Sequence, residues 1–336
     1  MTPEPAAEFG VGSDTLTAAF GEALAHLGTE SSRLVVLDGG PIGTTGAHHF
    51  REAHPERYFG FGSAHQTMVA AAKGLASVGF IPVVTAPAAF LLKGAAQIRL
   101  SLACAEANAK IVGTQAGLDA GERGVVFQAL EDIAAFRAIP GMTVIAPADC
   151  GEAAMATRAM LERDGPVYLR LGNRSSKASV SDAGFELGKG TILRDGTDVT
   201  IVACGVEVER ALDAALLLAH DNIDARVVNL ATIKPIDGEL LARCADVTGA
   251  FVTAEDHNIS GGLGGAVAEA LAQSLPCPIE FVGVRDVFGT GGSPEELAQH
   301  FGIAAEHIAE AAKRAVMRKR AQQSAERPAR RRAAAG

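Results

Sequence analysis

The feature that most constrains this chain is a repeated alternation between short apolar runs and longer amphipathic segments. Residues 34–38, LVVLD, form the first such run. It is continuously apolar up to its last residue, as in a strand that is buried on both faces of a sheet. Residues 15–27 precede it with apolar side chains at helical spacing. Because strands that alternate with helices pair in parallel, the chain is predicted to have an α/β fold.

The alternation predicts two consecutive parallel-sheet α/β domains within the 336 residues. In the first domain, residues 13–172, we predict strands at 34–38, 58–59, 80–85, 110–113, 142–147 and 167–171, and helices at 15–27, 63–77, 97–108, 128–138 and 150–163. In the second, residues 188–317, we predict strands at 198–203, 225–229, 249–253 and 279–284, and helices at 206–219, 238–245, 261–273 and from 294. Residues 1–12 are expected to be a loose lead, 173–187 a polar linker and 318–336 a basic, disordered tail.

The charge of the chain is unevenly distributed. The formal net charge is −9, but residues 318–336 hold seven Lys or Arg and one Glu, a net of +6, which leaves −9 − 6 = −15 for the rest. An acidic body argues against a nucleic-acid-binding fold, and a solvated tail is favoured over a tail that contacts RNA or a partner.

The sequence has no apolar stretch long enough for a membrane span and no secretory signal, so a cytoplasmic protein without membrane contact is expected. The five scattered cysteines include no CxxC pair, and no metal site is predicted.

The stretch RYFGFGSAHQTM, residues 57–68, is a candidate functional site. It is predicted to be an aromatic strand, a glycine turn and a helix that Ser63 caps. His65 would then lie in the first turn of that helix, where unpaired backbone N–H groups face the end of a parallel sheet. A polar side chain at that place can point into a crevice, which makes His65 a candidate for chemistry.

Several collinear motifs resemble one family. They are FIPVVT at 80–85, QIRL at 97–100, KIVGT at 110–114, QALEDI at 128–133, PGMTV at 140–144, GPVYLR at 165–170, IKPID at 233–237, GGLG at 261–264 and FGTGGSPEEL at 288–297. Together they resemble the C-terminal half of transketolase, in the form of a split-transketolase subunit, over about residues 14–316.

The resemblance implies a pyrimidine-binding domain followed by a transketolase C-terminal domain. It also implies thiamine diphosphate, shared with a second subunit. No GDG motif followed by paired asparagines is present in this sequence, so the diphosphate and Mg²⁺ are expected on an N-terminal-half partner, in an α2β2 heterotetramer.

By this resemblance His65 occupies the position of the family's cofactor-activating glutamate, and it is our candidate catalytic residue. We expect His65, Phe90, Gln66 and Phe61 to contact the cofactor, with Phe90 against its pyrimidine ring. A neutral histidine has one donor and one acceptor where the family has a carboxylate. Slower cofactor activation is therefore one interpretation, and a purely structural histidine in a changed site is the other.

Further departures fall on the residues expected to contact substrate. Gln115 and Phe127 stand where the family has histidines, and Arg123 replaces an aspartate. Arg170 occupies a position that binds a substrate phosphate in relatives, although a salt-bridged structural arginine fits that pattern equally well. The loss of acid and base groups favours a repurposed, more apolar pocket for a bulkier or less hydroxylated substrate.

Three functions follow from these observations. The first is a transketolase-like subunit that transfers a two-carbon ketol unit together with its partner. The second is a non-catalytic, structural or regulatory subunit that supports an N-terminal-half partner. The third is a β subunit of an α-keto acid dehydrogenase-like enzyme, which the PGMTV and QIRL motifs disfavour.

Overall fold

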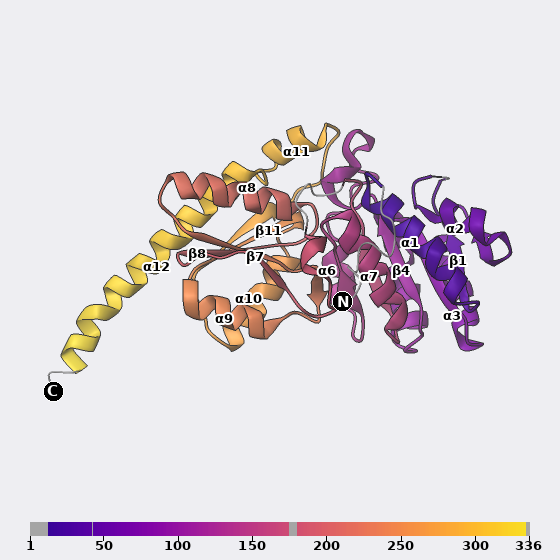
Figure 1. The fold of residues 1–336 in the computed structure, drawn as a ribbon, viewed down its shortest axis with the longest axis horizontal. Coiled ribbons are helices and arrows are strands. Elements are labelled where there is room, and N and C mark those ends of the chain that lie inside the picture. The colour runs from indigo at the N-terminus through magenta and orange to yellow at the C-terminus, as the bar shows by residue number, and fades with distance from the viewer. Residues whose placement is uncertain (1–12, 42, 175–179, 334–336) are drawn as a thin grey trace.

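A computed structural model of the protein describes residues 13–333, except for residue 42 and residues 175–179. It contains two α/β lobes that lie side by side, with a long C-terminal helix that extends beyond the second lobe (Figure 1). The predicted two-domain α/β fold is confirmed. The predicted lead at residues 1–12 lies outside the described residues.

The first lobe is built on a seven-stranded sheet with the order β10-β5-β6-β4-β3-β1-β2. Its strands are β1 Leu34–Asp38, β2 Tyr58–Gly60, β3 Ile81–Pro87, β4 Lys110–Thr114, β5 Thr143–Ile145, β6 Val167–Arg170 and β10 Thr232–Lys234. Its helices are α1 Leu16–Glu30, α2 Ala47–Ala53, α3 His65–Ser77, α4 Ala88–Leu91, α5 Ala95–Gln97, α6 Asp132–Arg137 and α7 Cys150–Glu162, with a π-helical turn at Ile98–Ala103 and 3₁₀ turns at Pro55–Arg57, Leu92–Gly94 and Gly117–Arg123. All neighbouring strands are parallel except β10 and β5. The carboxyl ends of β1, β3, β4 and β6 therefore lie at one edge of the sheet.

The second lobe is built on a five-stranded sheet with the order β12-β11-β8-β9-β7. Its strands are β7 Thr191–Arg194, β8 Val199–Ala203, β9 Ala225–Asn229, β11 Phe251–Asn258 and β12 Ile279–Val284. Its helices are α8 Glu207–His220, α9 Gly238–Thr248, α10 Leu263–Gln273, α11 Pro294–His300 and α12 Ala305–Ala333, with a 3₁₀ turn at Ser181–Ala183. Only β7 runs antiparallel to its neighbour.

The two lobes share a core. One cluster of buried side chains joins Val84 and Phe136 of the first lobe to Val202, Leu230 and Phe251 of the second. A further cluster lies between the first sheet and helices α1 and α7. Another lies mainly between the second sheet and helices α8 and α12, and Leu118, Leu130 and Ala148 of the first lobe also belong to it. The shared cluster fixes how the lobes sit against each other, because buried apolar surface at a junction resists its opening.

Several elements differ from the prediction. Residues 234–237 were expected to form a turn inside the second domain, but Thr232–Lys234 forms β10 and pairs with β5 of the first sheet. The helix expected from residue 128 begins only at Asp132. Gln128 lies outside any helix, and its side-chain amide donates to the carbonyl of Thr290 (2.8 Å) in the second lobe.

The basic tail is also a correction. Helix α12 continues through residues 318–333, where the sequence predicted disorder. Its earlier turns are anchored by buried side chains such as Ile308, Ala312 and Val316. From Arg318 to Arg327 the residues are mostly Ala, Arg, Lys, Gln and Glu, which are strong helix formers and extend a helix that is already nucleated.

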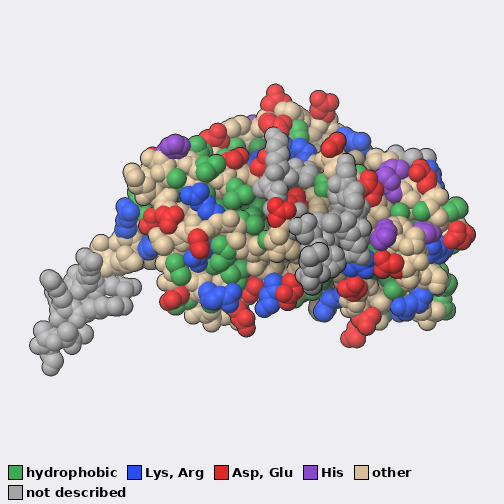
Figure 2. All heavy atoms as spheres, in the orientation of Figure 1, with side chains coloured by type: hydrophobic (Ala, Val, Ile, Leu, Met, Phe, Trp, Pro, Cys, Tyr) green, Lys and Arg blue, Asp and Glu red, His purple; other side chains and the backbone are tan. Residues whose placement is uncertain are grey.

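The surface carries charges of both signs. On the face drawn in Figure 2, acidic and basic side chains are interspersed over both lobes. No helix in the described part of the chain is long and apolar enough to cross a membrane.

Candidate functional site

The candidate site begins at the carboxyl end of β1. Asp38 ends this strand, and its carboxylate accepts hydrogen bonds from the Gly40 N–H (3.0 Å) and the Tyr58 hydroxyl (2.9 Å). Burial raises the pKa of the Asp38 carboxyl and, with the nearby carboxylate, raises that of Tyr58 to about 12. The next residue is Gly39, where a Cβ would lie only 2.8 Å from the Met68 side chain and 3.0 Å from the His65 ring. A glycine here lets the backbone approach His65 closely.

His65 is the first residue of α3, so it lies in the first turn of this helix, as the sequence predicted. Its side chain is 4% exposed, and Nε2 lies 3.1 Å from the Gly39 carbonyl oxygen. The predicted cap is wrong, because Ala64 is the N-cap residue and no side chain, including that of Ser63, caps this helix.

The Gly39 carbonyl determines which nitrogen of His65 carries the proton. A carbonyl oxygen only accepts, so Nε2 is the donor and Nδ1 of the neutral ring is a hydrogen-bond acceptor. Burial lowers the pKa of His65, the backbone groups of Gly39 and Ser63 oppose this shift, and the Lys93 charge adds to it. Because the net shift is downward, the ring is neutral at pH 7. Nδ1 is buried and has no hydrogen-bond partner among the described residues. A buried acceptor without a donor is costly, which marks Nδ1 as an atom that a ligand can satisfy.

Two aromatic rings lie beside His65. The Phe90 ring centroid is 5.7 Å from that of His65 and 5.0 Å from that of Phe127, and the rings are tilted in both pairs. The Lys93 ammonium lies 4.8 Å from the Phe90 centroid. The structure therefore brings His65, Phe90 and Phe127 into one continuous group, although they come from three separate segments.

The other two predicted cofactor contacts lie at the margins of this group. Gln66 is exposed, and its amide donates to the Lys93 carbonyl (3.1 Å). Phe61 is half-buried and packs against the shared core, while its backbone N–H donates to the Asp38 carbonyl (2.7 Å). Their contact with a cofactor stays a prediction.

The loop after β4 brings two predicted substrate residues together. Gln115 is buried, and its side-chain oxygen accepts a hydrogen bond from Nη1 of Arg123 at 2.9 Å. The Arg123 guanidinium carbon lies 5.4 Å from the Phe127 ring centroid. The aromatic group is therefore extended by one cation, the Arg123 guanidinium, which contacts Gln115 and Phe127.

Arg170 is engaged elsewhere. It is 6% exposed, and its Nε donates to both carboxylate oxygens of Asp132 (2.9 and 3.2 Å). Nη2 donates to the carbonyls of Asp256 (2.7 Å) and Ala129 (3.4 Å). This geometry supports the structural interpretation of Arg170, since its guanidinium holds the junction between the lobes.

Other buried polar residues belong to the same junction. His257 is fully buried, accepts a hydrogen bond at Nε2 from the Ala134 N–H (3.3 Å), and has a pKa lowered to about 4 by burial. Glu255 accepts from the N–H groups of Leu263 and Gly264, at the start of α10. These contacts are structural, because they join backbone and side-chain groups of the folded lobes to each other.

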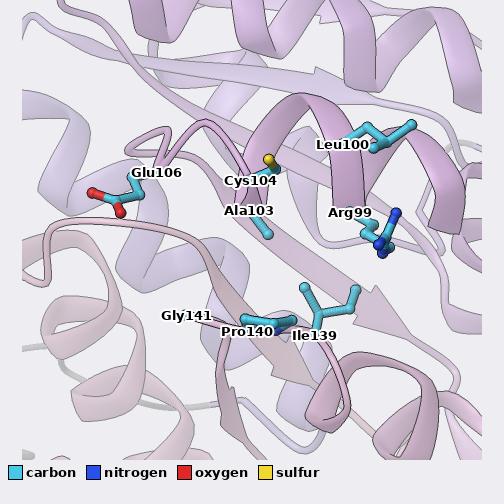
Figure 3. A pocket seen from close by; sticks show the side chains of 8 residues that line it. All are labelled: Arg99, Leu100, Ala103, Cys104, Glu106, Ile139, Pro140 and Gly141. Carbon is cyan, nitrogen blue, oxygen red and sulfur yellow. The ribbon is translucent and has the colours of Figure 1, made fainter.

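A separate cavity of about 320 Å³ contains none of the predicted site residues (Figure 3). It is lined by Arg99, Leu100, Ala103, Cys104, Glu106, Ile139, Pro140 and Gly141. Within the described residues, no group of three or more His, Cys, Asp or Glu is arranged to hold a metal ion.

The sequence did not single out three residues that shape the site, namely Asp38, Gly39 and Lys93. The only available signal was their position, since Asp38 ends an apolar strand at the edge where ligands bind. The contacts of Lys93 depend on the fold of a loop and had no signal in the sequence.

The fold and the site define a class of protein: a two-domain, mostly parallel α/β chain in which a buried hydrogen-bond acceptor lies beside aromatic rings. Two family models match the chain, "Transketolase, pyrimidine binding domain" at residues 14–177 and "Transketolase, C-terminal domain" at 188–308. The chain belongs to the transketolase family and comprises these two domains, which confirms the resemblance seen in the sequence.

Individual relatives agree with this assignment. The chain is 43% identical to a "Putative transketolase C-terminal section" of Methanocaldococcus jannaschii, over 86% of this chain and 92% of that protein. It is 39% identical to the "6-deoxy-6-sulfo-D-fructose transketolase subunit SqwH" of a Clostridium species, over 89% and 93%. A solved structure described as "Split gene transketolase, inactive beta4 tetramer" matches with a TM-score of 0.85 and 41% identity, over 91% of this chain and all of the other. Membership of this family implies dependence on thiamine diphosphate.

Proposed function

We propose that this chain is one subunit of a split, thiamine diphosphate-dependent enzyme that transfers a two-carbon ketol unit. An N-terminal-half partner holds the diphosphate and Mg²⁺, and the two chains form an α2β2 heterotetramer. The observation that carries this proposal is the buried, unpartnered Nδ1 of His65 beside Phe90. Two relatives that are themselves described as a C-terminal section and a transketolase subunit support the split arrangement. A cytoplasmic location is part of the proposal.

The residues present fit the pyrimidine end of the cofactor. Phe90 supplies an aromatic surface, and Nδ1 of His65 supplies one hydrogen-bond acceptor. When bound, thiamine diphosphate supplies the carbon nucleophile that carries the ketol unit. This chain holds the pyrimidine ring of the cofactor and excludes water with Phe90 and Phe127. Nδ1 of His65 accepts a hydrogen bond only from a pyrimidine nitrogen that carries a proton.

His65 performs this task differently from the family's glutamate. A glutamate carboxylate attracts a proton through its charge, whereas neutral Nδ1 attracts it only through a lone pair. We expect cofactor activation to proceed more slowly than with a carboxylate, by a factor of about 10² to 10⁴, the range typical of a displaced proton-transfer group.

The partner subunit is required for two reasons. The described residues offer no metal-ion cluster, and the sequence has no diphosphate motif of the GDG type. In addition, the solved relative formed of four β chains is described as inactive, which supports the need for a second type of chain.

The alternative is a non-catalytic subunit that completes the assembly and stabilises an active partner. The replacement of the glutamate by His65 is the observation that favours it. A β subunit of an α-keto acid dehydrogenase-like enzyme is a weaker alternative, because the relatives above are described as transketolases.

Reconstitution with the N-terminal-half partner tests the proposal. Binding of thiamine diphosphate and Mg²⁺ is measured by calorimetry, and ketol transfer is measured for wild type, His65→Glu, His65→Ala and the control His220→Ala. His220 is an exposed histidine of the second lobe. We expect the pair to exceed the partner alone, His65→Ala to lose most of this gain, His65→Glu to increase it, and the control to match wild type. The catalytic proposal fails if neither wild type nor His65→Ala differs from the partner alone.

A further inference from the structure

The loop that follows β4 presents one cation at the site, Arg123. Of its donors, Nη1 is occupied by Gln115, while Nε and Nη2 have no partner among the described residues. Gln115 is neutral, so it positions the guanidinium without cancelling its charge. Gln115 also has a φ of +53°, a left-handed conformation that costs a non-glycine residue roughly 1 kcal/mol or more. The loop therefore tolerates a strained backbone at the residue that positions Arg123.

A second cation, Lys93, lies on the same pair of aromatic rings. Its ammonium faces Phe90 at 4.8 Å, and the Arg123 guanidinium faces Phe127 at 5.4 Å, while the two ring centroids are 5.0 Å apart. In the described part of the chain, neither cation has a carboxylate within 4.0 Å. The adjacent Glu122 is exposed and forms no ion pair with described residues.

This arrangement is unusual for the chain. Its formal charge is −9, and its other site arginine, Arg170, is buried against Asp132. A guanidinium with its fork partly free is the side chain best suited to bind two oxygens of a carboxylate or phosphate. A nearby ammonium adds positive charge and, unlike the planar guanidinium, does not require one fixed orientation of the anion.

We infer that Arg123, positioned by Gln115 and Phe127 and assisted by Lys93, binds an oxyanion group of the substrate, a carboxylate or a phosphate, beside the aromatic rings. The inference rests on the proposed function for its claim that the anion belongs to a substrate. It replaces Arg170 as the anion-binding arginine of this chain.

The test uses the full chain alone and three probes that share one carbon skeleton: glycerol 3-phosphate, glycerate and glycerol. Binding is followed at low ionic strength by calorimetry and by the amide NMR signals of residues 117–127. We expect saturable binding of at least one anion, with shifts in this loop, and no binding of glycerol. A preference between phosphate and carboxylate identifies the group.

Variants distinguish a specific anion-binding site from the general attraction of anions to positive charge. Arg123→Gln should weaken anion binding by about tenfold, which corresponds to the loss of one charge-assisted hydrogen bond. Arg123→Lys should retain part of the affinity, because the charge remains and the fork is lost. Arg99→Gln, in the separate cavity of Figure 3, removes another exposed arginine and should leave binding unchanged.

Equal weakening by Arg123→Gln and Arg99→Gln, or an absence of saturable binding to wild type, would overturn the inference. The assay needs neither cofactor nor turnover. A failure of ketol transfer in the reconstituted pair therefore refutes the proposed function while leaving this measurement intact. If both succeed, kcat/KM for an anionic substrate should fall with Arg123→Gln more than that for an uncharged analogue.

Discussion

The junction between the lobes offers a sharp test of how the structure is stabilised, through the substitution Arg170→Met. Methionine preserves much of the side chain's volume and removes its charge. Asp132, whose side chain is fully buried, then loses both contacts with Nε and keeps the hydrogen bond from the Tyr168 hydroxyl (2.6 Å). Two backbone carbonyls, those of Asp256 and Ala129, lose their donor as well.

The expected cost is about 3–5 kcal/mol of unfolding free energy, the range measured when one partner of a buried ion pair is removed. With an m-value of about 3 kcal/mol per molar urea, the midpoint of unfolding should fall by about 1–1.7 M. Urea titrations followed by circular dichroism measure this shift. Arg123→Met is the control, and it should change the unfolding free energy by less than about 0.5 kcal/mol because Arg123 is exposed.

A double variant tests the cause. If the cost arises from an uncompensated carboxylate, adding Asp132→Asn to Arg170→Met should restore part of the lost stability. A loss below about 1 kcal/mol in Arg170→Met would refute the argument, and it would return Arg170 to the candidates for substrate binding.

Three further changes probe the fold. Gly113→Ala should destabilise the first lobe by about 1–3 kcal/mol in denaturant titrations, because its Cβ would lie 2.3 Å from the Tyr168 hydroxyl oxygen; an unchanged midpoint would contradict this close packing. Burial raises the pKa of Glu152 to about 7. The folded state therefore binds more protons than the unfolded state between about pH 4.5 and 7, and the contribution of Glu152 to the free energy of unfolding should fall as pH rises through that window. Relative to Glu152→Gln, wild type should lose up to about 3 kcal/mol of stability from pH 5 to pH 8, and parallel pH profiles would disprove the assignment. Deletion of residues 321–336 should shift the unfolding midpoint by less than the equivalent of about 1 kcal/mol, since residues 321–325 are exposed, and a larger loss would show that α12 is anchored beyond Arg320.

The sequence by itself determined most strands, most helices and the order of the domains. Runs such as residues 34–38 and 199–203 are mostly apolar and buried at every residue, and this burial on both faces favours the parallel sheet. The sequence also located His65 at the start of a helix, because a glycine turn between an aromatic strand and an apolar helical pattern is a local signal.

Only the tertiary structure decided the features that depend on distant partners. β10 joins the first sheet although it lies in the second domain's sequence, because its hydrogen-bond partner is β5, 80 or more residues away. The tautomer of His65 is set by the carbonyl of Gly39, and the role of Arg170 by Asp132. The pattern of apolar residues along the sequence encodes which segments are buried. The protonation and the hydrogen-bond partners of a polar side chain depend instead on which atoms folding places beside it.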